Sequence, residues 1–252
     1  MPNIYETERL LAEYLLFHYG YAEDVFTGQW EPKGMREGLH FPERCVNACL
    51  DLYTIPANAR ALDAGCAVGR ASFELSRYCG SVTGIDFSRR FIEAANALKN
   101  EGELAFQRLE EGARTTPCTA RVPQEIVRGR VSFETGDAMD LRGDLGDFDV
   151  VLAANLLCRL GDPAKFLARL PQLVKPGGQL VLTTPCTWLE EFTPHANWLC
   201  GSDSTTLDGL HGHLDAHFEF VKQTDLPFLL REHARKFQWT VAQGTLWRRR
   251  GN

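Results

Sequence analysis

The sequence predicts an α/β fold, a Rossmann-like arrangement built on a seven-stranded mixed sheet. From residue 59 onward, short apolar runs alternate with amphipathic segments, which is typical of successive β-α-β units and a parallel sheet. The tail over 218–249 is rich in Phe, Trp, Val and Thr and shows no helical repeat. Two long strands joined near 233–236 fit this tail, so we expect an antiparallel hairpin at the end of the sheet.

The expected parallel strands are the runs 59–63, 81–86, 130–134, 148–154 and 179–184. Helices fill the intervals between them. Ser88 is the predicted N-cap of the helix that follows the second strand, and Asp162 with Pro163 opens another helix. Right-handed crossovers would then place helices on both faces of the sheet.

We expect one domain over 1–252, with an N-terminal helical cap over 1–55 and the Rossmann-like core over 56–252. The first cap helix follows from the helical spacing of Leu10, Leu11, Tyr14, Leu15 and His18. A second helix is expected to start at Pro42 and to bury Val46, Cys49, Leu50 and Tyr53.

Composition excludes several classes of function. The 252 residues include 27 Lys and Arg against 33 Asp and Glu, a net charge of −6, so the chain lacks the positive surface that nucleic-acid binders need. The longest apolar stretch, 150–157, is far shorter than the roughly 20 residues of a membrane span. The first residues do not resemble a secretory signal, so we expect a cytoplasmic protein whose eight cysteines are free thiols.

The strongest chemical signal is the stretch 62–70, in which a strand runs into a glycine-bearing turn that opens a helix. A side chain at Gly65 or Gly69 would keep the backbone from approaching a ligand or the helix from packing onto the strand. The dinucleotide fingerprint does not fit, because Ala67 stands where its second glycine would be. A ligand site at the strand ends is expected, and a nicotinamide cofactor is disfavoured.

Polar residues follow three further strands. Asp86 ends the second strand, 21 residues after Gly65, where a carboxylate can accept both hydroxyls of a ribose. Asp137 and Ala138 follow the third strand, and Asn155 follows the fourth. The alternative interpretation is that Asp63 and Asp86 only cap strand ends in some other Rossmann-like protein.

This ordered set resembles the class I S-adenosylmethionine-dependent methyltransferases over residues 59–250, and it implies their fold and S-adenosylmethionine as cofactor. The resemblance implies that the ribose is held by Asp86, with Phe87 beside the adenine and Asp137 and Ala138 at the adenine edge. The residues that would line the methionine side are Asp63, Gly65, Cys66 and Gly69, and Asn155 is a further expected cofactor-binding residue. Ala67 departs from the glycine usual in the family's loop.

A narrower resemblance spans nearly the whole chain. The stretches 5–7, 13–20, 41–45, 65–75, 185–191 and 227–239 are similar to the mercaptohistidine N-methyltransferases of ovothiol biosynthesis. In that family the activity is often joined to an N-terminal part that forms the C–S bond on histidine, for which this chain has no room. The resemblance implies a stand-alone enzyme that receives 5-mercaptohistidine (4-mercaptohistidine in the other numbering), with transient contact to the upstream enzyme, and methylates a ring nitrogen to give ovothiol A.

Such a substrate requires an arginine, an acceptor for its ammonium group and an aromatic wall. Asn155 and Arg159 are the expected catalytic residues because they follow the fourth strand. The expected substrate-binding residues are Tyr14, His18, Tyr19, Trp188, Glu190 and Arg231. Each also has a structural interpretation, as a core aromatic residue, a solvated charge or a hydrogen-bonded histidine.

No metal is expected. His213, His217 and Glu219 have the spacing of the iron site in the C–S-forming enzymes, and His211 stands nearby. However, Phe218 and Phe220 alternate like one face of a strand, so a helix passing into a strand explains the pattern better. Two other functions stay open: a methyltransferase for another small imidazole, thiol or carboxylate, and a non-catalytic protein that binds S-adenosylmethionine.

Overall fold

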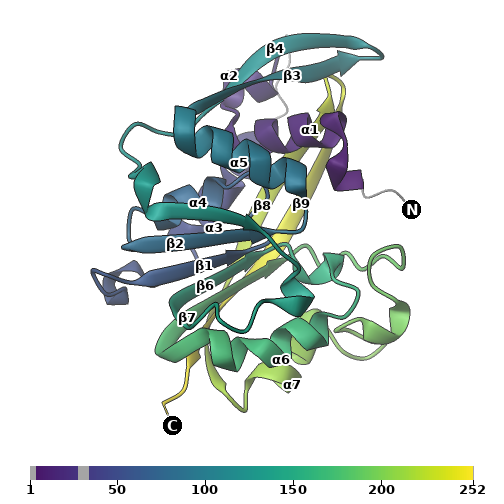
Figure 1. Cartoon of the computed structure of the whole chain (residues 1–252). Coiled ribbons are helices and arrows are strands. Elements are labelled where there is room, and N and C mark those ends of the chain that lie inside the picture. Colours follow the sequence, from purple (N-terminus) through teal and green to yellow (C-terminus); the bar gives the residue numbers. More distant parts are fainter. Residues whose placement is uncertain (1–3, 28–33, 252) are drawn as a thin grey trace.

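Seven strands form one mixed sheet in the computed structural model, which describes residues 4–27 and 34–251 (Figure 1). The strand order is β5-β2-β1-β6-β7-β9-β8, and β9 runs antiparallel to both of its neighbours. The strands are β1 (Arg60–Ala64), β2 (Ser81–Asp86), β5 (Val131–Thr135), β6 (Phe148–Ala154), β7 (Val174–Thr184), β8 (Phe218–His233) and β9 (Lys236–Arg249). The predicted sheet and its C-terminal hairpin are confirmed.

Helices cover both faces of this sheet (Figure 1). The α-helices are α1 (Glu8–Tyr19), α2 (Ala22–Val25), α3 (Phe41–Asn47), α4 (Arg70–Leu75), α5 (Arg89–Glu101), α6 (Pro163–Leu173) and α7 (Thr206–Leu214). A hydrophobic core lies on each face of the sheet, and alternate residues of β6 point into one or the other. Val150 packs with residues of α1, α3, α4 and α5, whereas Val151 packs with residues of α6 and α7. Strands buried on both faces explain the continuous apolar runs in the sequence.

Short 3₁₀ helices connect these elements. They are η1 (Ile4–Glu6), η2 (Met35–Gly38), η3 (Leu52–Thr54), η4 (Arg128–Arg130), η5 (Ala138–Asp140), η6 (Leu157–Arg159) and η7 (His195–Asn197). The predicted N-cap Ser88 and the predicted helix start at Asp162 are confirmed, since Ser88 Oγ accepts a hydrogen bond from Phe91 N at 3.2 Å and Asp162 Oδ1 accepts one from Lys165 N at 3.2 Å.

The cap, described over 4–27 and 34–55, has both expected helices, α1 and α3. One expectation for it is wrong. Tyr53 is 101% exposed, because α3 ends at Asn47 and the chain turns through η3, so Tyr53 does not continue the apolar face of α3. Cys49 and Leu50, which precede that turn, are buried as expected.

A second, two-stranded sheet was absent from the sequence-based expectation. Strands β3 (Glu103–Glu111) and β4 (Arg114–Arg121) form an antiparallel hairpin beyond α5, beside α1 (Figure 1). An isolated hairpin is marginal in water, so tertiary contacts must hold it. Glu110 supplies one such contact, because its carboxylate pairs with both Arg108 and Arg231 at 2.6 Å. Among the described residues, no helix is long and apolar enough to cross a membrane.

Candidate functional site

The strand order brings the predicted polar residues to one edge of the sheet. From β1 the chain order runs outward through β2 and β5 on one side, and through β6 and β7 on the other. Parallel sheets bind ligands at the carboxyl ends of the strands where the order reverses in this way, here between β1 and β6. Asp63, Asp86, Asp137 and Asn155 lie in or directly after β1, β2, β5 and β6 near these ends.

The loop after β1 depends on its two glycines. Gly65 has φ +75° and Gly69 has φ +85°, values that side chains disfavour. A Cβ at Gly65 would lie 2.9 Å from Leu156 Cδ1, and one at Gly69 would lie 2.5 Å from Phe133 Cζ. The two glycines therefore have two roles: they allow the positive φ angles of the loop, and they allow the loop to pack closely against Leu156 and Phe133.

Asp86 ties this loop to the start of α5. Its Oδ2 accepts a hydrogen bond from Ala67 N at 2.9 Å, and its Oδ1 accepts one from Ser88 N at 2.8 Å. Burial raises the pKa of Asp86, although these two donors oppose the shift. Ala67 adopts φ +48°, so alanine takes the left-handed conformation at the position where the sequence departs from glycine.

Asp63 lies beneath the loop. Only 1% of it is exposed, and its Oδ2 accepts a hydrogen bond from Ser72 Oγ at 2.6 Å. Burial raises the pKa of this carboxyl to about 7. Cys66 is also buried, whereas Phe87 is 66% exposed at the edge of the site.

Two further strand ends are fixed by local hydrogen bonds. Asp137 Oδ1 accepts a bond from Met139 N at 2.8 Å, which caps η5 and sets the position of Ala138. Asn155 has φ +52°, and its Oδ1 accepts a bond of 2.9 Å from Thr183 Oγ1 at the end of β7. Thr183 holds the amide of Asn155 in one orientation.

Arg159 follows Asn155 by one turn of chain. Its guanidinium donates to the carbonyl oxygen of Cys158 at 3.0 Å and lies 4.6 Å from the centre of the Phe192 ring. It also lies close to the hydroxyl of Tyr5, since the charge of Arg159 opposes the rise that burial causes in the pKa of Tyr5. Tyr5 belongs to the stretch 5–7 of the narrower resemblance, but the sequence predicts no role for this residue in the site.

The N-terminal segment brings the three expected aromatic residues of α1 to this region. Tyr14 packs on Phe91 with ring centres 4.8 Å apart, and Tyr19 donates a hydrogen bond to Val68 O at 2.8 Å. His18 is buried, and its Nδ1 has no hydrogen-bond partner within 4–27 and 34–251. Burial, with the positive charge of Arg70 as a smaller cause, lowers the pKa of His18 to about 3, so the ring is neutral at pH 7.

Hydrogen bonds from α5 hold this segment in place. Ser88 Oγ donates to Tyr5 O at 3.1 Å, and Arg89 N donates to Glu6 Oε1 at 3.0 Å. Ser88 and Asp86 are two residues apart, so the segment lies next to the predicted ribose-binding position.

Of the other three expected substrate residues, Trp188 and Arg231 have partners elsewhere and Glu190 is exposed. Trp188 lies in the core under α7, where its Nε1 donates to Thr206 Oγ1 at 3.0 Å, and Glu190 is exposed. Arg231 pairs with Glu110 and donates to the carbonyl oxygen of Asp24 at 3.0 Å, so its partners come from β3 and α2 rather than from the strand ends.

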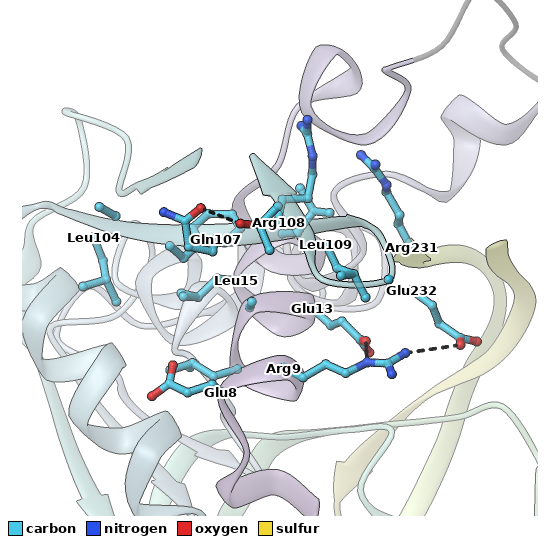
Figure 2. A pocket seen from close by; sticks show the side chains of 17 residues that line it. Glu8, Arg9, Glu13, Leu15, Leu104, Gln107, Arg108, Leu109, Arg231 and Glu232 are labelled. Carbon is cyan, nitrogen blue, oxygen red and sulfur yellow. Dashed lines mark hydrogen bonds and ion pairs between the residues drawn. The ribbon is translucent and has the colours of Figure 1, made fainter. Parts of the chain in front are cut away.

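A cavity of about 640 Å³ also lies away from the strand ends, between α1, β3 and β8 (Figure 2). Leu15, Leu104 and Leu109 contribute apolar walls. Figure 2 shows Arg9 at its rim between Glu13, at 2.8 Å, and Glu232, at 3.9 Å. Arg231 lines it as well, so among the described site candidates this residue alone borders the cavity.

The histidine pattern divides between two elements. α7 ends at Leu214 and β8 begins at Phe218, as the alternation of phenylalanines predicted, so His213 and Glu219 lie on different elements. His211 Nδ1 lies 2.9 Å from Asp215 Oδ1. In the described part of the chain, no group of three or more His, Cys, Asp or Glu residues is arranged to hold a metal ion.

Sequence comparisons agree with this geometry. Residues 62–182 match the family model of a methyltransferase domain. The methyltransferase GfsG of Streptomyces halstedii is 24% identical over 163 residues, 64% of this chain and 51% of that protein. The ubiquinone biosynthesis O-methyltransferase of Coxiella burnetii is 26% identical over 161 residues, 64% of this chain and 58% of that protein. The chain thus spans about half the length of these curated relatives.

Solved structures share the architecture. The cyclase SpnF matches with a TM-score of 0.60 and 17% identity, over 99% of this chain and 95% of that chain. The N-methyltransferase NodS of Bradyrhizobium japonicum WM9 matches with a TM-score of 0.51 and 16% identity, over 77% and 88% of the two chains. These identities establish a shared fold. A fold common to a cyclase and a methyltransferase does not identify the reaction, which must be argued from the site.

Proposed function

Because residues 62–182 belong to the class I S-adenosylmethionine-dependent methyltransferases, we propose that this chain methylates an imidazole ring nitrogen of 5-mercaptohistidine. The observation that carries the proposal is the convergence of two sets of residues. The family motifs meet at the ends of β1, β2, β5 and β6, and the stretches 5–7 and 13–20 pack beside them. Two stretches that resemble the mercaptohistidine N-methyltransferases therefore lie beside the strand-end motifs that resemble the class I methyltransferases.

The family cofactor is S-adenosylmethionine, and the residues present suit it. Asp86 offers a carboxylate at the end of β2, already oriented by two backbone donors. We assign the ribose to Asp86, the adenine to Phe87, Asp137 and Ala138, and the methionine portion to the loop with Asp63, Gly65, Cys66 and Gly69. Since Asp63 is buried against Ser72, its assigned role is to support the loop from beneath.

When bound, the cofactor supplies a methyl group on a positively charged sulfur, and the protein has to align the acceptor in line with it. A strong general base is not needed if the ring nitrogen arrives unprotonated. Asn155, held by Thr183, can orient the acceptor at the end of β6. His18 stays neutral at pH 7, so it can accept a hydrogen bond without repelling the positive sulfur.

Tyr14 and Tyr19 contribute by closing the site rather than by chemistry. Tyr19 ties α1 to the loop through Val68, and Tyr14 packs against Phe91 of α5. A closed site excludes water from the reacting atoms. Trp188, Glu190 and Arg231 belong to the proposed substrate contacts only if the loop after β7 and the tip of β8 approach the acceptor when it binds.

A different acceptor is the main rival. One relative is named as an O-methyltransferase, so a small hydroxylated or carboxylate acceptor in this chain is the second candidate. The two proposals differ in the atom that is methylated, and a mass-spectrometric assay reports that atom directly.

The test is incubation of the full chain with S-adenosylmethionine and a panel of acceptors: 5-mercaptohistidine, histidine, imidazole thiols and phenolic carboxylates. We expect N-methylation of 5-mercaptohistidine, with kcat/KM at least tenfold above that for histidine, because a buried polar contact to the sulfur would be left unpaired by histidine. Comparable rates on histidine, methylation of sulfur, or turnover of the oxygen acceptors alone would refute the proposal.

A further inference from the structure

We propose that Arg159 binds an anionic group of the methyl acceptor and that Tyr5 positions its guanidinium. The substrates of this site would then be small acceptors that carry a thiolate or a carboxylate. The inference deepens the proposed function and rests on methyl transfer occurring at the ends of β1 and β6.

The position of Arg159 is the first argument. It lies at the end of η6, four residues after Asn155, and it is half-buried. One face of its guanidinium is covered by the Phe192 ring at 4.6 Å. A planar cation stacked on an aromatic ring is restricted to one orientation, and its N–H groups then point in fixed directions.

The missing counter-charge is the second argument. The fully buried arginines have carboxylates close by: Arg70 lies 2.7 Å from Glu43, and Arg108 and Arg231 each lie 2.6 Å from Glu110. Within residues 4–27 and 34–251, no carboxylate forms an ion pair with Arg159. A half-buried cation that lacks a carboxylate partner at a ligand site favours an anionic ligand.

The third argument is that the group beside the Arg159 guanidinium on the N-terminal side, Tyr5, is neutral. The Tyr5 hydroxyl lies close to Arg159, and the Tyr5 ring contacts the rings of Tyr14 and Phe91 edge-on, with centres 6.1 and 5.9 Å away. The backbone of Tyr5 is held by Ser88 Oγ. The N-terminal segment therefore orients Arg159 without neutralising it, which leaves the charge for a ligand.

The rival ligand is the carboxylate of the methionine portion of the cofactor. Two observations favour the acceptor. Within residues 4–27 and 34–251, Arg159 contacts its neighbour Cys158, Phe192 after β7 and Tyr5 in η1, and it contacts no residue of the 65–69 loop. In addition, the side chain that packs against Gly65 is that of Leu156, which a Cβ on Gly65 would approach to 2.9 Å, and not that of Arg159.

Binding measurements separate the two ligands. In the full chain we would prepare Arg159→Gln, which keeps hydrogen-bond donors and removes the charge, Tyr5→Phe, and the control Arg114→Gln on the exposed hairpin. Calorimetry would measure the affinity for S-adenosylhomocysteine, and then the affinity of the S-adenosylhomocysteine complex for each acceptor. We expect Arg159→Gln to weaken 5-mercaptohistidine binding about 10- to 100-fold, as for the loss of a charge-assisted hydrogen bond.

Three acceptor probes identify the anionic group. Histidine carries the carboxylate without the thiolate, the decarboxylated thiol 5-mercaptohistamine carries the thiolate without the carboxylate, and histamine carries neither. Arg159→Gln should weaken the binding of 5-mercaptohistidine and of either histidine or 5-mercaptohistamine. It should leave the binding of histamine unchanged. Tyr5→Phe should weaken the same probes about 3- to 10-fold, while Arg114→Gln changes nothing.

Several outcomes would overturn the inference. They are unchanged acceptor affinity in Arg159→Gln, equal losses for all probes including histamine, and a loss confined to S-adenosylhomocysteine, which would make Arg159 a cofactor ligand. Failure of the proposed function looks different. If 5-mercaptohistidine is not methylated but another anionic imidazole or carboxylate binds and depends on Arg159, the inference stands and the assigned substrate is wrong. Thermal unfolding of each variant verifies that it is folded.

Discussion

The hydroxyl of Tyr19 donates a hydrogen bond of 2.8 Å to the carbonyl oxygen of Val68, and this bond joins the N-terminal cap to the loop after β1. Tyr19 is at the last position of α1, and Val68 lies between Cys66 and Gly69 in the loop after β1. Both residues are buried, so water cannot replace the bond. The cap and the loop are therefore coupled, and a change in one should be felt by the other.

Tyr19→Phe should lower the free energy of unfolding by about 1–3 kcal/mol, because the buried carbonyl of Val68 loses its partner. Urea denaturation would measure the change. Tyr53→Phe is the matched control: Tyr53 is fully exposed, and the same loss of a hydroxyl should leave the stability unchanged. Equal losses in the two variants would show that the Tyr19 bond contributes no stability.

Gly69 and Gly177 allow backbone conformation to be separated from crowding. Gly69 has φ +85° and Gly177 has φ +77°, but a Cβ on Gly69 would lie 2.5 Å from Phe133 Cζ, whereas one on Gly177 would meet nothing within 4 Å. Gly177→Ala should lower the free energy of unfolding by about 1–2 kcal/mol, because alanine disfavours the left-handed conformation. Gly69→Ala should lower it by the same amount and by about 1–3 kcal/mol more, because the new Cβ would also be overpacked against Phe133.

Denaturant unfolding of both alanine variants would measure these costs. The double variant Gly69→Ala with Phe133→Leu adds a further control, because the smaller side chain should recover part of the loss. Equal costs at the two glycines would mean that Phe133 moves aside and that crowding does not constrain the loop.

The strand ends could be predicted from sequence because each depends on a short local pattern. An apolar run that ends in Asp86, or a run followed by Asn155, places the polar residue at a strand end whatever the rest of the chain does. Right-handed crossovers then predict helices on both faces of the sheet, whereas the order of the strands could not be read from these local patterns. The Gly65 and Gly69 turn was identifiable for the same reason.

Partners distant in sequence could not be predicted in this way. Arg231 pairs with Glu110, 121 residues away, in a hairpin whose polar and exposed positions give no strong strand signal. Trp188 bonds to Thr206 because α7 packs over it. The contact of Tyr5 with Arg159 likewise depends on how the N-terminal segment crosses α5, so sequence could show that residues 5–7 matter but not what they touch.

Asp86→Asn should weaken the binding of S-adenosylmethionine and S-adenosylhomocysteine, and Asp86→Ala should weaken it more. For Asp86→Ala we expect a loss of about 2–4 kcal/mol of binding free energy, because two hydrogen bonds from the ribose to a charged acceptor are lost. Asparagine keeps one oxygen for the donors from Ala67 or Ser88, so comparing the variants separates charge from loop support. Calorimetry provides the affinities, with exposed Asp144→Asn as control. Unchanged affinity in Asp86→Ala, or tighter binding of NAD, would refute the ribose assignment.

The buried carboxyl of Asp63 should make the stability of the protein depend on pH. Burial raises its folded-state pKa to about 7, against about 3.9 in the unfolded chain. Between about pH 4 and pH 7 the folded protein therefore keeps a proton that the unfolded chain has released. Stability from this group is then fully present near pH 4 and is lost as the pH rises toward 7, by at most about 1.4 kcal/mol per pH unit.

The comparison of wild type with Asp63→Asn isolates this effect. Asparagine cannot ionise, and its amide oxygen can still accept the hydrogen bond from Ser72 Oγ. Acid-sensitive groups such as His18, whose pKa lies at about 3, act equally on both proteins and cancel in the difference. The wild type should lose stability relative to Asp63→Asn in urea titrations from pH 4 to pH 8. A difference that stays constant over this range would mean that Asp63 is ionised throughout, because only a group that changes protonation between the folded and unfolded states can produce a slope.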